Sequence, residues 1–403
     1  MERLSPRLLG QTPPLPPSPG AELVIYLLAR PGWRSREELS KVLPDAEQAL
    51  QAVRESSYGP YLEEDGDRVQ LRAESDVLAY WQDAYRDWEK TSRRYGELVP
   101  GFESPFPAFR DWLENERREM LHALWGTAVG KANALLDQGA RDAALALLAG
   151  AEAAYPLEPA AALDLADFYW RARRPADTAR IIENVLDEIP DNQRGRARLN
   201  LAAARLRAGN EEAALAGLKE LEAESGNLGS WAGVHRGSHA VLTGAPELGL
   251  RLAEEAFAAA EKATDGELAI AALMLKGEAL TALGRPKEAV HALGEALGIH
   301  ELMGRSFSPV VLALLAEAHA AWGYKDKARE LAEKAFKEAR ARRDPYAASR
   351  ALWALHHATG EAGYAEMARR EAEQAGHEPW RRRLLELARD EDQGEAARGR
   401  GGG

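Results

Sequence analysis

Several polar and basic side chains near the N-terminus have the types and spacing that contact nucleic acid. Arginine binds phosphate or the edge of a guanine, glutamine pairs with adenine, and serine bonds phosphate oxygens. Some of these residues share a short segment with helical periodicity, and the others stand at an expected helix start or beside an expected hairpin turn. The candidate contacts are Arg34, Ser35, Arg36, Gln48, Gln51, Arg54, Ser57 and Arg68.

The charge of the same region opposes this chemistry. Residues 21–78 contain seven basic and twelve acidic side chains, a balance of −5. Most of the affinity for DNA comes from neutralising phosphates, so an acidic domain binds DNA at a disadvantage. Two interpretations therefore stay open for this region, a DNA-binding domain or a domain of the same fold that serves protein interaction or structure.

Residue patterns for catalysis or metal binding are weak. The chain has no cysteine, which excludes disulfides, thiolate metal sites and cysteine nucleophiles. His235 and His239 are one turn apart on an expected helix, but two ligands are too few for a metal site. The segment GTAVGKAN, residues 126–133, lacks the spacing and the hydroxyl of a phosphate-binding loop. We therefore expect no enzymatic activity, no cofactor and no metal.

An internal repeat occupies the larger, C-terminal part of the chain. A helix-breaking position is followed five residues later by a small residue, and the pair recurs every 35 to 40 residues. That length fits two helices and two turns, a unit that must stack on its neighbours to bury its apolar side. We therefore predict a mainly α-helical fold with an α-solenoid over residues 117–390. The breaks are Gly139, Arg174, Gly209, Gly244, Gly284, Gly323 and Gly360, and the small residues are Ala144, Ala179, Ala214, Gly249, Ala289, Ala328 and Ala365.

The repeat resembles the tetratricopeptide repeat, in which the first helix of each pair lines a concave surface. A mixture of charged, aromatic and methionine side chains there suits a protein, a peptide or a small effector. The alternative is that these are ordinary packed or solvated repeat positions. By this register the concave residues are Asn133, Asp164, Phe168, Arg171, Arg196, Trp231, Ser238, Met274, Glu278, Glu317, Arg350 and His357.

The first 78 residues are expected to form a winged helix-turn-helix. A proline-rich arm over residues 1–20 precedes a buried helix near 21–30. A second helix is capped by Ser35 with Glu38 three residues later, and a third helix is capped by Asp45. Asp65-Gly66 then indicates a β-hairpin, so three helices and a wing follow one another.

Three further segments complete the expected organisation. An aromatic amphipathic helix from Ser75 to Trp88, a loop, and a long helix from about Phe109 belong mainly to a connecting segment over residues 79–116. The solenoid is expected to close with the helix WRRRLLELARDE, which starts at Trp380. Residues 391–403 read as a flexible tail by composition.

This order of elements resembles the SARP-type antibiotic-regulatory activators, which carry a bacterial transcriptional activator domain. The resemblance covers about residues 1–190. It implies a transcription regulator that binds double-stranded DNA through its N-terminal domain and is regulated through its repeats. The alternative is a tetratricopeptide-like protein-interaction scaffold that does not bind DNA. The residues that carry the resemblance are Pro100, Gly101, Phe102, Trp112, Leu113, Glu116 and Arg117 in LVPGFESPFPAFRDWLENERREML, and Arg36, Glu37, Glu38 and Leu39 in LLARPGWRSREELSKVLP.

The composition indicates where such a protein works. Across 403 residues with a net charge of −12, no run of 18 or more apolar residues occurs, and the N-terminus lacks a basic-then-apolar signal. We therefore expect a cytoplasmic protein without membrane partners. The net negative charge argues against wholesale wrapping of nucleic acid. A homodimer is compatible with the sequence.

Overall fold

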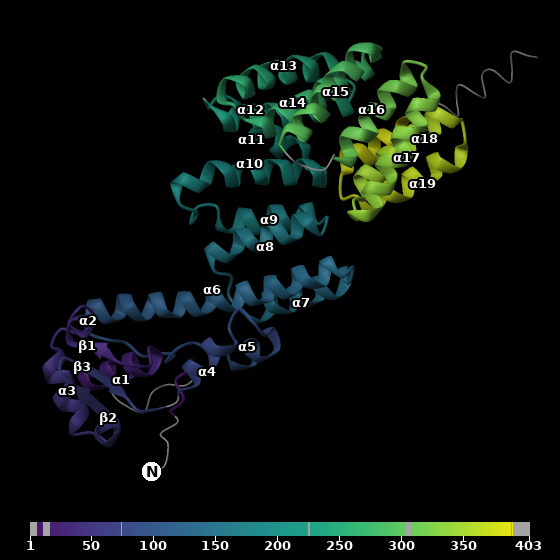
Figure 1. The fold of residues 1–403 in the computed structure, drawn as a ribbon. Helices are drawn as coiled ribbons and strands as arrows, with labels where there is room; N and C mark the ends of the chain where they lie inside the picture. Colours follow the sequence, from purple (N-terminus) through teal and green to yellow (C-terminus); the bar gives the residue numbers. More distant parts are fainter. Residues whose placement is uncertain are drawn as a thin grey trace, which may run out of the picture. The chain divides into compact units, whose positions relative to one another are not determined.

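The computed structural model describes residues 6–10, 17–73, 75–224, 226–303, 308–387 and 389. It is mainly helical, with one small sheet near the N-terminus (Figure 1). The chain forms two compact units, the first ending at Phe168 and the second beginning at Tyr169. The division falls within helix α8 (Pro159–Arg171), so the first helix pair of the repeat region belongs to the N-terminal unit. Across the described ranges, no helix combines the length and apolarity that a membrane span requires.

The first unit begins with three helices and a three-stranded antiparallel sheet. The strand order is β1-β3-β2, with Arg34 opposite Val69 and Asp65 opposite Arg68. The two-residue strand β1 was not expected from the sequence, because a pairing this short leaves no periodic pattern. The arrangement fits a winged helix-turn-helix. Its elements are α1 (Pro19–Ala29), β1 (Arg34–Ser35), α2 (Arg36–Ser40), α3 (Ala46–Arg54), a 3-10 turn (Gly59–Tyr61), β2 (Leu62–Asp65) and β3 (Arg68–Leu71).

Local hydrogen bonds explain why these elements begin where they do. Ser35 and Glu38 form the expected capping box, in which the Glu38 amide donates to Ser35 Oγ at 3.1 Å and the Ser35 amide donates to Glu38 Oε2 at 2.8 Å. The carboxylate of Asp45 caps α3 by accepting from the Gln48 amide at 2.9 Å. Gly66 lies in the left-handed region, with a φ of +64°, at the hairpin turn between β2 and β3.

The arm that precedes α1 is only partly described. Leu9 forms an isolated antiparallel bridge with Leu98, and the amides of Leu8 and Leu9 donate to the carboxylate of Asp76 at 2.9 and 3.1 Å. This agrees with an extended arm at residues 6–10. Residues 1–5 and 11–16 lie outside the described residues, and Pro19 already begins α1.

The connecting segment consists of α4 (Asp76–Asp83), α5 (Trp88–Arg94) and the long helix α6 (Pro107–Asp137). The single helix expected from Ser75 to Trp88 is wrong, because α4 ends at Asp83 and Tyr85 adopts a positive φ of 63°. Arg117 on α6 holds the preceding loop, donating to the carbonyl oxygens of Leu98 at 3.0 Å and Val99 at 2.9 Å. Arg117 belongs to the segment that resembles the activator family, and here its role is structural.

Antiparallel helix pairs build the rest of the chain. In the first unit α6 packs against α7. In the second unit α9 packs against α10, and the odd-numbered helices α11 to α19 each pack against the even-numbered helix before them. The first helices of successive pairs, α10, α12, α14, α16 and α18, also contact one another in order, which produces an inner layer (Figure 1). The helices are α7 (Arg141–Ala154), α9 (Pro175–Val185), α10 (Asp191–Ala208), α11 (Glu211–Glu222), α12 (Asn227–Leu242), α13 (Pro246–Ala263), α14 (Gly266–Ala282), α15 (Pro286–Leu302), α16 (Pro309–Ala321), α17 (Lys325–Ala341), α18 (Pro345–Thr359) and α19 (Ala362–Gln374).

The small residues of the repeat lie where helices approach each other closely. A Cβ atom on Gly237 would stand 2.5 Å from Cδ2 of Leu275, so no larger residue fits between α12 and α14 without a shift. Most of the predicted breaks are glycines with positive φ that end the first helix of a pair. The break predicted at Arg174 is wrong by one residue. Arg173 has the positive φ, 60°, and the buried Thr178 takes the place that the sequence assigned to Ala179.

A final helix over residues 378–387 crosses back over the second unit. Trp380 and Leu384 are buried, and the Trp380 indole donates to Ser349 Oγ on α18 at 2.9 Å. Arg382 donates to the carboxylate of Glu211 at the start of α11, at 2.8 Å. The helix expected to cover one end of the solenoid therefore contacts both α11 and α18 within the second unit. The predicted tail, residues 391–403, lies outside the described residues.

Candidate functional site

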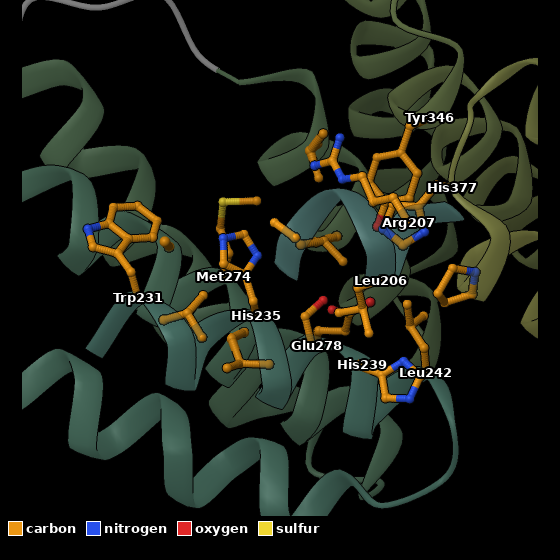
Figure 2. Close-up of a pocket in the computed structure, with 18 residues that line it drawn as sticks. Leu206, Arg207, Trp231, His235, His239, Leu242, Met274, Glu278, Tyr346 and His377 are labelled. Atoms are coloured by element: carbon orange, nitrogen blue, oxygen red, sulfur yellow. The ribbon is translucent and has the colours of Figure 1, made fainter. Parts of the chain in front are cut away.

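Two adjoining hollows open on the inner layer of the second unit. The first is lined from α10, α12, α14, α16, α18 and the start of the final helix, has a cavity volume of about 240 Å³ and is partly open to solvent (Figure 2). The second has a cavity volume of about 280 Å³ and shares Leu242, Glu278 and Leu314 with the first. Hollows of this size can hold a small effector or the end of a peptide. The two hollows form the candidate site.

A buried ion cluster separates the two hollows. Arg350 on α18 is 2% exposed and donates to Glu278 on α14 at 2.5 Å and to Glu317 on α16 at 2.7 and 2.8 Å. Its guanidinium also lies over the ring of Trp380, 4.3 Å from the centroid. Burial by itself would lower the pKa of Arg350, but the carboxylates of Glu317 and Glu278 raise it well above the ordinary value. The cluster fixes the spacing of three successive inner helices.

Arg207 projects from α10 into the first hollow, near Tyr346 and His377 (Figure 2). Its guanidinium carbon lies 4.0 Å from the centroid of the Trp170 ring, a cation–π contact. Burial lowers the pKa of Arg207 to about 10, so the side chain keeps its charge at neutral pH. Within the described ranges, Arg207 has no hydrogen bond or ion pair.

Three histidines of the first hollow are held in their neutral form. Burial, with a smaller contribution from Arg207 and Arg196, lowers the pKa of His235 to about 4. Burial also lowers the pKa of His377, whose ring stacks on Tyr346 at 4.8 Å, well below its usual value. Burial lowers the pKa of His239 too, and its Nδ1 has no partner among the described residues. At neutral pH these imidazoles therefore offer hydrogen bonds without charge.

An apolar wall completes the first hollow. Trp231 and Met274 line it beside the polar groups (Figure 2), together with Val310 and Leu314. An apolar surface next to a few convergent polar groups is the usual composition of a ligand-binding pocket. In the described part of the chain, no group of three or more metal-binding side chains is placed to hold an ion.

The structure brings seven of the twelve predicted groove residues together. The first hollow is lined by Trp231, Ser238, Met274 and Glu278, and the second by Glu278, Glu317, Arg350 and His357. Arg196 is exposed on α10, and its charge acts on His235.

The other predicted groove residues line neither hollow. Asn133 and Phe168 belong to the first unit, and Arg171 lies at the end of α8. Phe168 is fully buried, so its assignment to a binding surface is wrong.

The sequence reasoning missed Arg207, Tyr346 and His377. Arg207 lies on the same inner face of α10 as Ala203, so continuing the repeat register along α10 would have reached it. Tyr346 is at the start of α18, where the register was applied only to Arg350 and His357. His377 enters the hollow through the return of the final helix, which no local sequence signal indicates.

The predicted DNA contacts lie in the first unit, and their arginines are engaged. Arg54 donates to both carboxylate oxygens of Glu64 at 2.8 Å, and Arg36 donates to the same carboxylate at 2.9 Å. The hydrogen bond from Arg54 lowers the pKa of Glu64. Arg68 pairs with Asp65 at 2.8 Å. A DNA phosphate would have to displace these acids.

The remaining predicted contacts divide into two groups. Arg34 donates to the carbonyl oxygens of Arg30 and Pro31, at 3.1 and 3.3 Å, while Ser35 caps α2. Arg34 and Ser35 therefore stabilise the backbone between α1 and α2. Gln48, Gln51 and Ser57 are exposed on or just after α3, although the Gln51 amide donates to Glu55 at 2.5 Å.

This chain resembles two solved structures at low sequence identity. No family model and no curated protein matches this sequence. One similar solved structure is a signal transduction ATPase with numerous domains, with a tetratricopeptide repeat sensor, from Pyrococcus horikoshii. It is 15% identical over 89% of this chain and 56% of that chain, with a TM-score of 0.38. This chain therefore spans little more than half of the length of that protein. Another is a Rap protein complexed with competence and sporulation factor, 15% identical over 92% of this chain and 96% of that chain, with a TM-score of 0.36.

Proposed function

We propose that this protein is a non-enzymatic, cytoplasmic binding protein whose second unit holds a peptide or a small effector in the first hollow. The observation that supports this is the hollow itself. The inner helices of successive repeats bring an apolar wall from Trp231 and Met274 next to polar groups from Arg207 and His235. The hollow can hold a small ligand or the end of a peptide.

Filling the hollow tests this function. The neutral apolar dye N-phenyl-1-naphthylamine is titrated into the full chain and followed by its fluorescence. The substitution Met274→Trp adds bulk to the wall, and we expect dye affinity to fall about tenfold or more. The matched control is Met367→Trp on α19, where the native side chain is 43% exposed and lines neither hollow. Equal dye binding by all three proteins would contradict the proposal, provided that far-UV circular dichroism shows all three folded.

We also propose DNA binding by the first unit as a second function. The exposed face of α3, with Gln48, Gln51 and Arg54, supports it, and the β2–β3 hairpin adjoins that face through Glu64. The paired arginines favour the alternative, a winged unit used for protein contacts. The two interpretations differ in what Glu64 does, because its carboxylate occupies both Arg36 and Arg54.

A fluorescence-anisotropy titration with a random-sequence duplex at low and moderate salt separates these functions. If α3 contacts DNA, Glu64→Gln releases Arg54 and leaves Arg36 paired with Glu47 alone, which strengthens binding and steepens its salt dependence, while Arg54→Gln weakens it. Glu373→Gln on α19 is the control, because this exposed acid is in the second unit. No salt-dependent binding by any of the proteins would show that the first unit is not a DNA-binding domain.

A further inference from the structure

The position of Arg207 says more about the ligand than the hollow alone does. This inference rests on the proposed binding function of the second unit. Neighbouring arginines in this unit have acidic partners: Arg205 pairs with Glu183 at 2.8 Å, and Arg173 pairs with Asp344 at 3.1 Å. Arg207, two residues from Arg205 on α10, lines the hollow, and its side chain has no such partner among the described residues.

The contact with Trp170 determines which part of Arg207 stays available. The indole covers one face of the planar guanidinium at 4.0 Å. Guanidinium N–H groups point outward in the plane, so stacking on a face leaves the edge free to donate. An edge with parallel N–H groups matches the two oxygens of a carboxylate. Stacking also restricts the orientation of the side chain, which reduces the entropy lost when a ligand binds.

The acidic side chains near Arg207 are paired with other cations, so Arg207 can bind a further anion. Asp344, the carboxylate that acts on it, is engaged by Arg173 and caps α18. Elsewhere around the first hollow, Glu278 is engaged by Arg350, as described above. Glu211, which approaches His239 at 3.7 Å, pairs with Arg382 of the final helix. The acids that face this hollow are thus already bound to other cations.

The residues that line the hollow determine the chemistry of the rest of the ligand. Trp231, Met274 and Leu314 present apolar surface in the same hollow as Arg207. The imidazole of His235 lies beside Met274 and that of His377 beside Tyr346, and both offer neutral donors or acceptors (Figure 2). A ligand that fits both ends carries one anionic group and an apolar body. A purely apolar ligand would leave the guanidinium desolvated and unpaired.

We propose that the first hollow binds an apolar carboxylate, with the carboxylate group on the edge of Arg207 and the apolar body against Trp231 and Met274. The carboxylate belongs either to the C-terminus of a short peptide or to a small organic acid. Both sources present the same chemistry to Arg207.

Two dyes that share one aromatic ring system and differ in charge test whether Arg207 binds an anionic group. 8-Anilinonaphthalene-1-sulfonate carries a negative charge, and N-phenyl-1-naphthylamine does not. For Arg207→Gln we expect affinity for the charged dye to fall about tenfold or more, with affinity for the neutral dye changed less than about twofold. The affinity of Arg207→Lys for the charged dye should lie between those of the unmodified protein and Arg207→Gln. Lysine keeps the charge but lacks the planar edge of the guanidinium. Arg205→Gln, on the same helix but outside the hollow, should change neither affinity.

Competition then identifies the source of the carboxylate. Octanoate is compared with octanamide, and a pentapeptide with a free C-terminus is compared with its amidated form, each displacing the charged dye. Stronger displacement by either free acid than by its amide supports the proposal and names the source. No difference within either pair overturns the carboxylate assignment.

The variants keep the two proposals distinguishable. If Arg207→Gln changes neither dye affinity while Met274→Trp weakens both, the hollow binds ligands but Arg207 does not select an anion. If Met274→Trp also has no effect, the proposed binding function fails as well. Far-UV circular dichroism and thermal unfolding of each variant confirm that a lost affinity is not a lost fold.

Discussion

The two units place their arginines in different environments. In the first unit, Arg36 and Arg54 lie near the surface and share the carboxylate of Glu64, which is 30% exposed. In the second unit, Arg350 is buried between two carboxylates, whereas Arg207 lines the first hollow and forms no ion pair with a carboxylate in the described part of the chain. Water and salt screen the first arrangement strongly and the second weakly.

This difference separates three roles for one residue type. A surface pair contributes little to stability and is easily exchanged for another anion. A buried pair is costly to break, because the remaining charges lose their partner away from water. A half-buried guanidinium without a partner is available to a ligand. Arginines of the first unit are therefore expected to exchange one anionic partner for another, whereas Arg350 is structural and Arg207 binds a ligand.

The largest expected effect comes from breaking the buried cluster. Arg350→Met leaves Glu278 and Glu317 without their cation, and we expect the free energy of unfolding to fall by about 3–5 kcal/mol. Arg54→Gln, which removes a surface pair, should lower it by less than about 1 kcal/mol. Urea titrations followed by far-UV circular dichroism give both values. Equal losses in the two variants would refute the distinction between the units.

A smaller effect is expected from enlarging a small residue of the repeat. Ala332 on α17 is fully buried in the core around α16 and α18, so Ala332→Leu should destabilise the second unit by about 1–3 kcal/mol through overpacking. Its neighbour Glu333 is exposed, and Glu333→Leu should change the stability by less than about 0.5 kcal/mol. Hydrogen exchange of the second unit would show where the loss occurs. A neutral Ala332→Leu would mean that close helix approach is not required here.

The third effect depends on pH and concerns the hollow of the second unit. The pKa of His235 is about 4 in the folded protein and about 6.5 in an unfolded chain. Between these values the unfolded chain takes up a proton that the folded protein does not, so stability falls as the pH falls through this window. His235→Gln should remove part of that loss, while His239 and His377 maintain the rest. The loss of stability is measured from the unfolding midpoints of both proteins between about pH 7 and about pH 4. An identical pH dependence of the two midpoints would contradict the lowered pKa of His235.

Local signals account for the parts of the fold that the sequence predicted well. The caps at Ser35 and Asp45 and the hairpin at Gly66 depend on residues within a few positions of each other, so their pattern is visible in the sequence. The helix pairs follow from the spacing of glycines and small residues. The register of the pairs also placed Trp231 and Met274 in one hollow.

Features that depend on distant contacts could not be predicted in the same way. The strand β1 exists because Arg34 and Ser35 pair with β3, far along the chain. The turn at Arg173 has no glycine to mark it, so its position was misread by one residue. Glu64 engages the arginines of α2 and α3 from the hairpin, which no charge count shows.

The return of the final helix has a consequence for how the second unit can change in evolution. An open row of helix pairs can gain or lose a pair at either end, because each pair contacts only its neighbours. Here Arg382 reaches Glu211, and Arg173 reaches Asp344, so early and late pairs are fastened together. Duplicating or deleting one pair would move these partners apart. These ion pairs between early and late helix pairs therefore constrain the number of pairs in the second unit. Variation is then expected mainly as substitutions within the existing pairs.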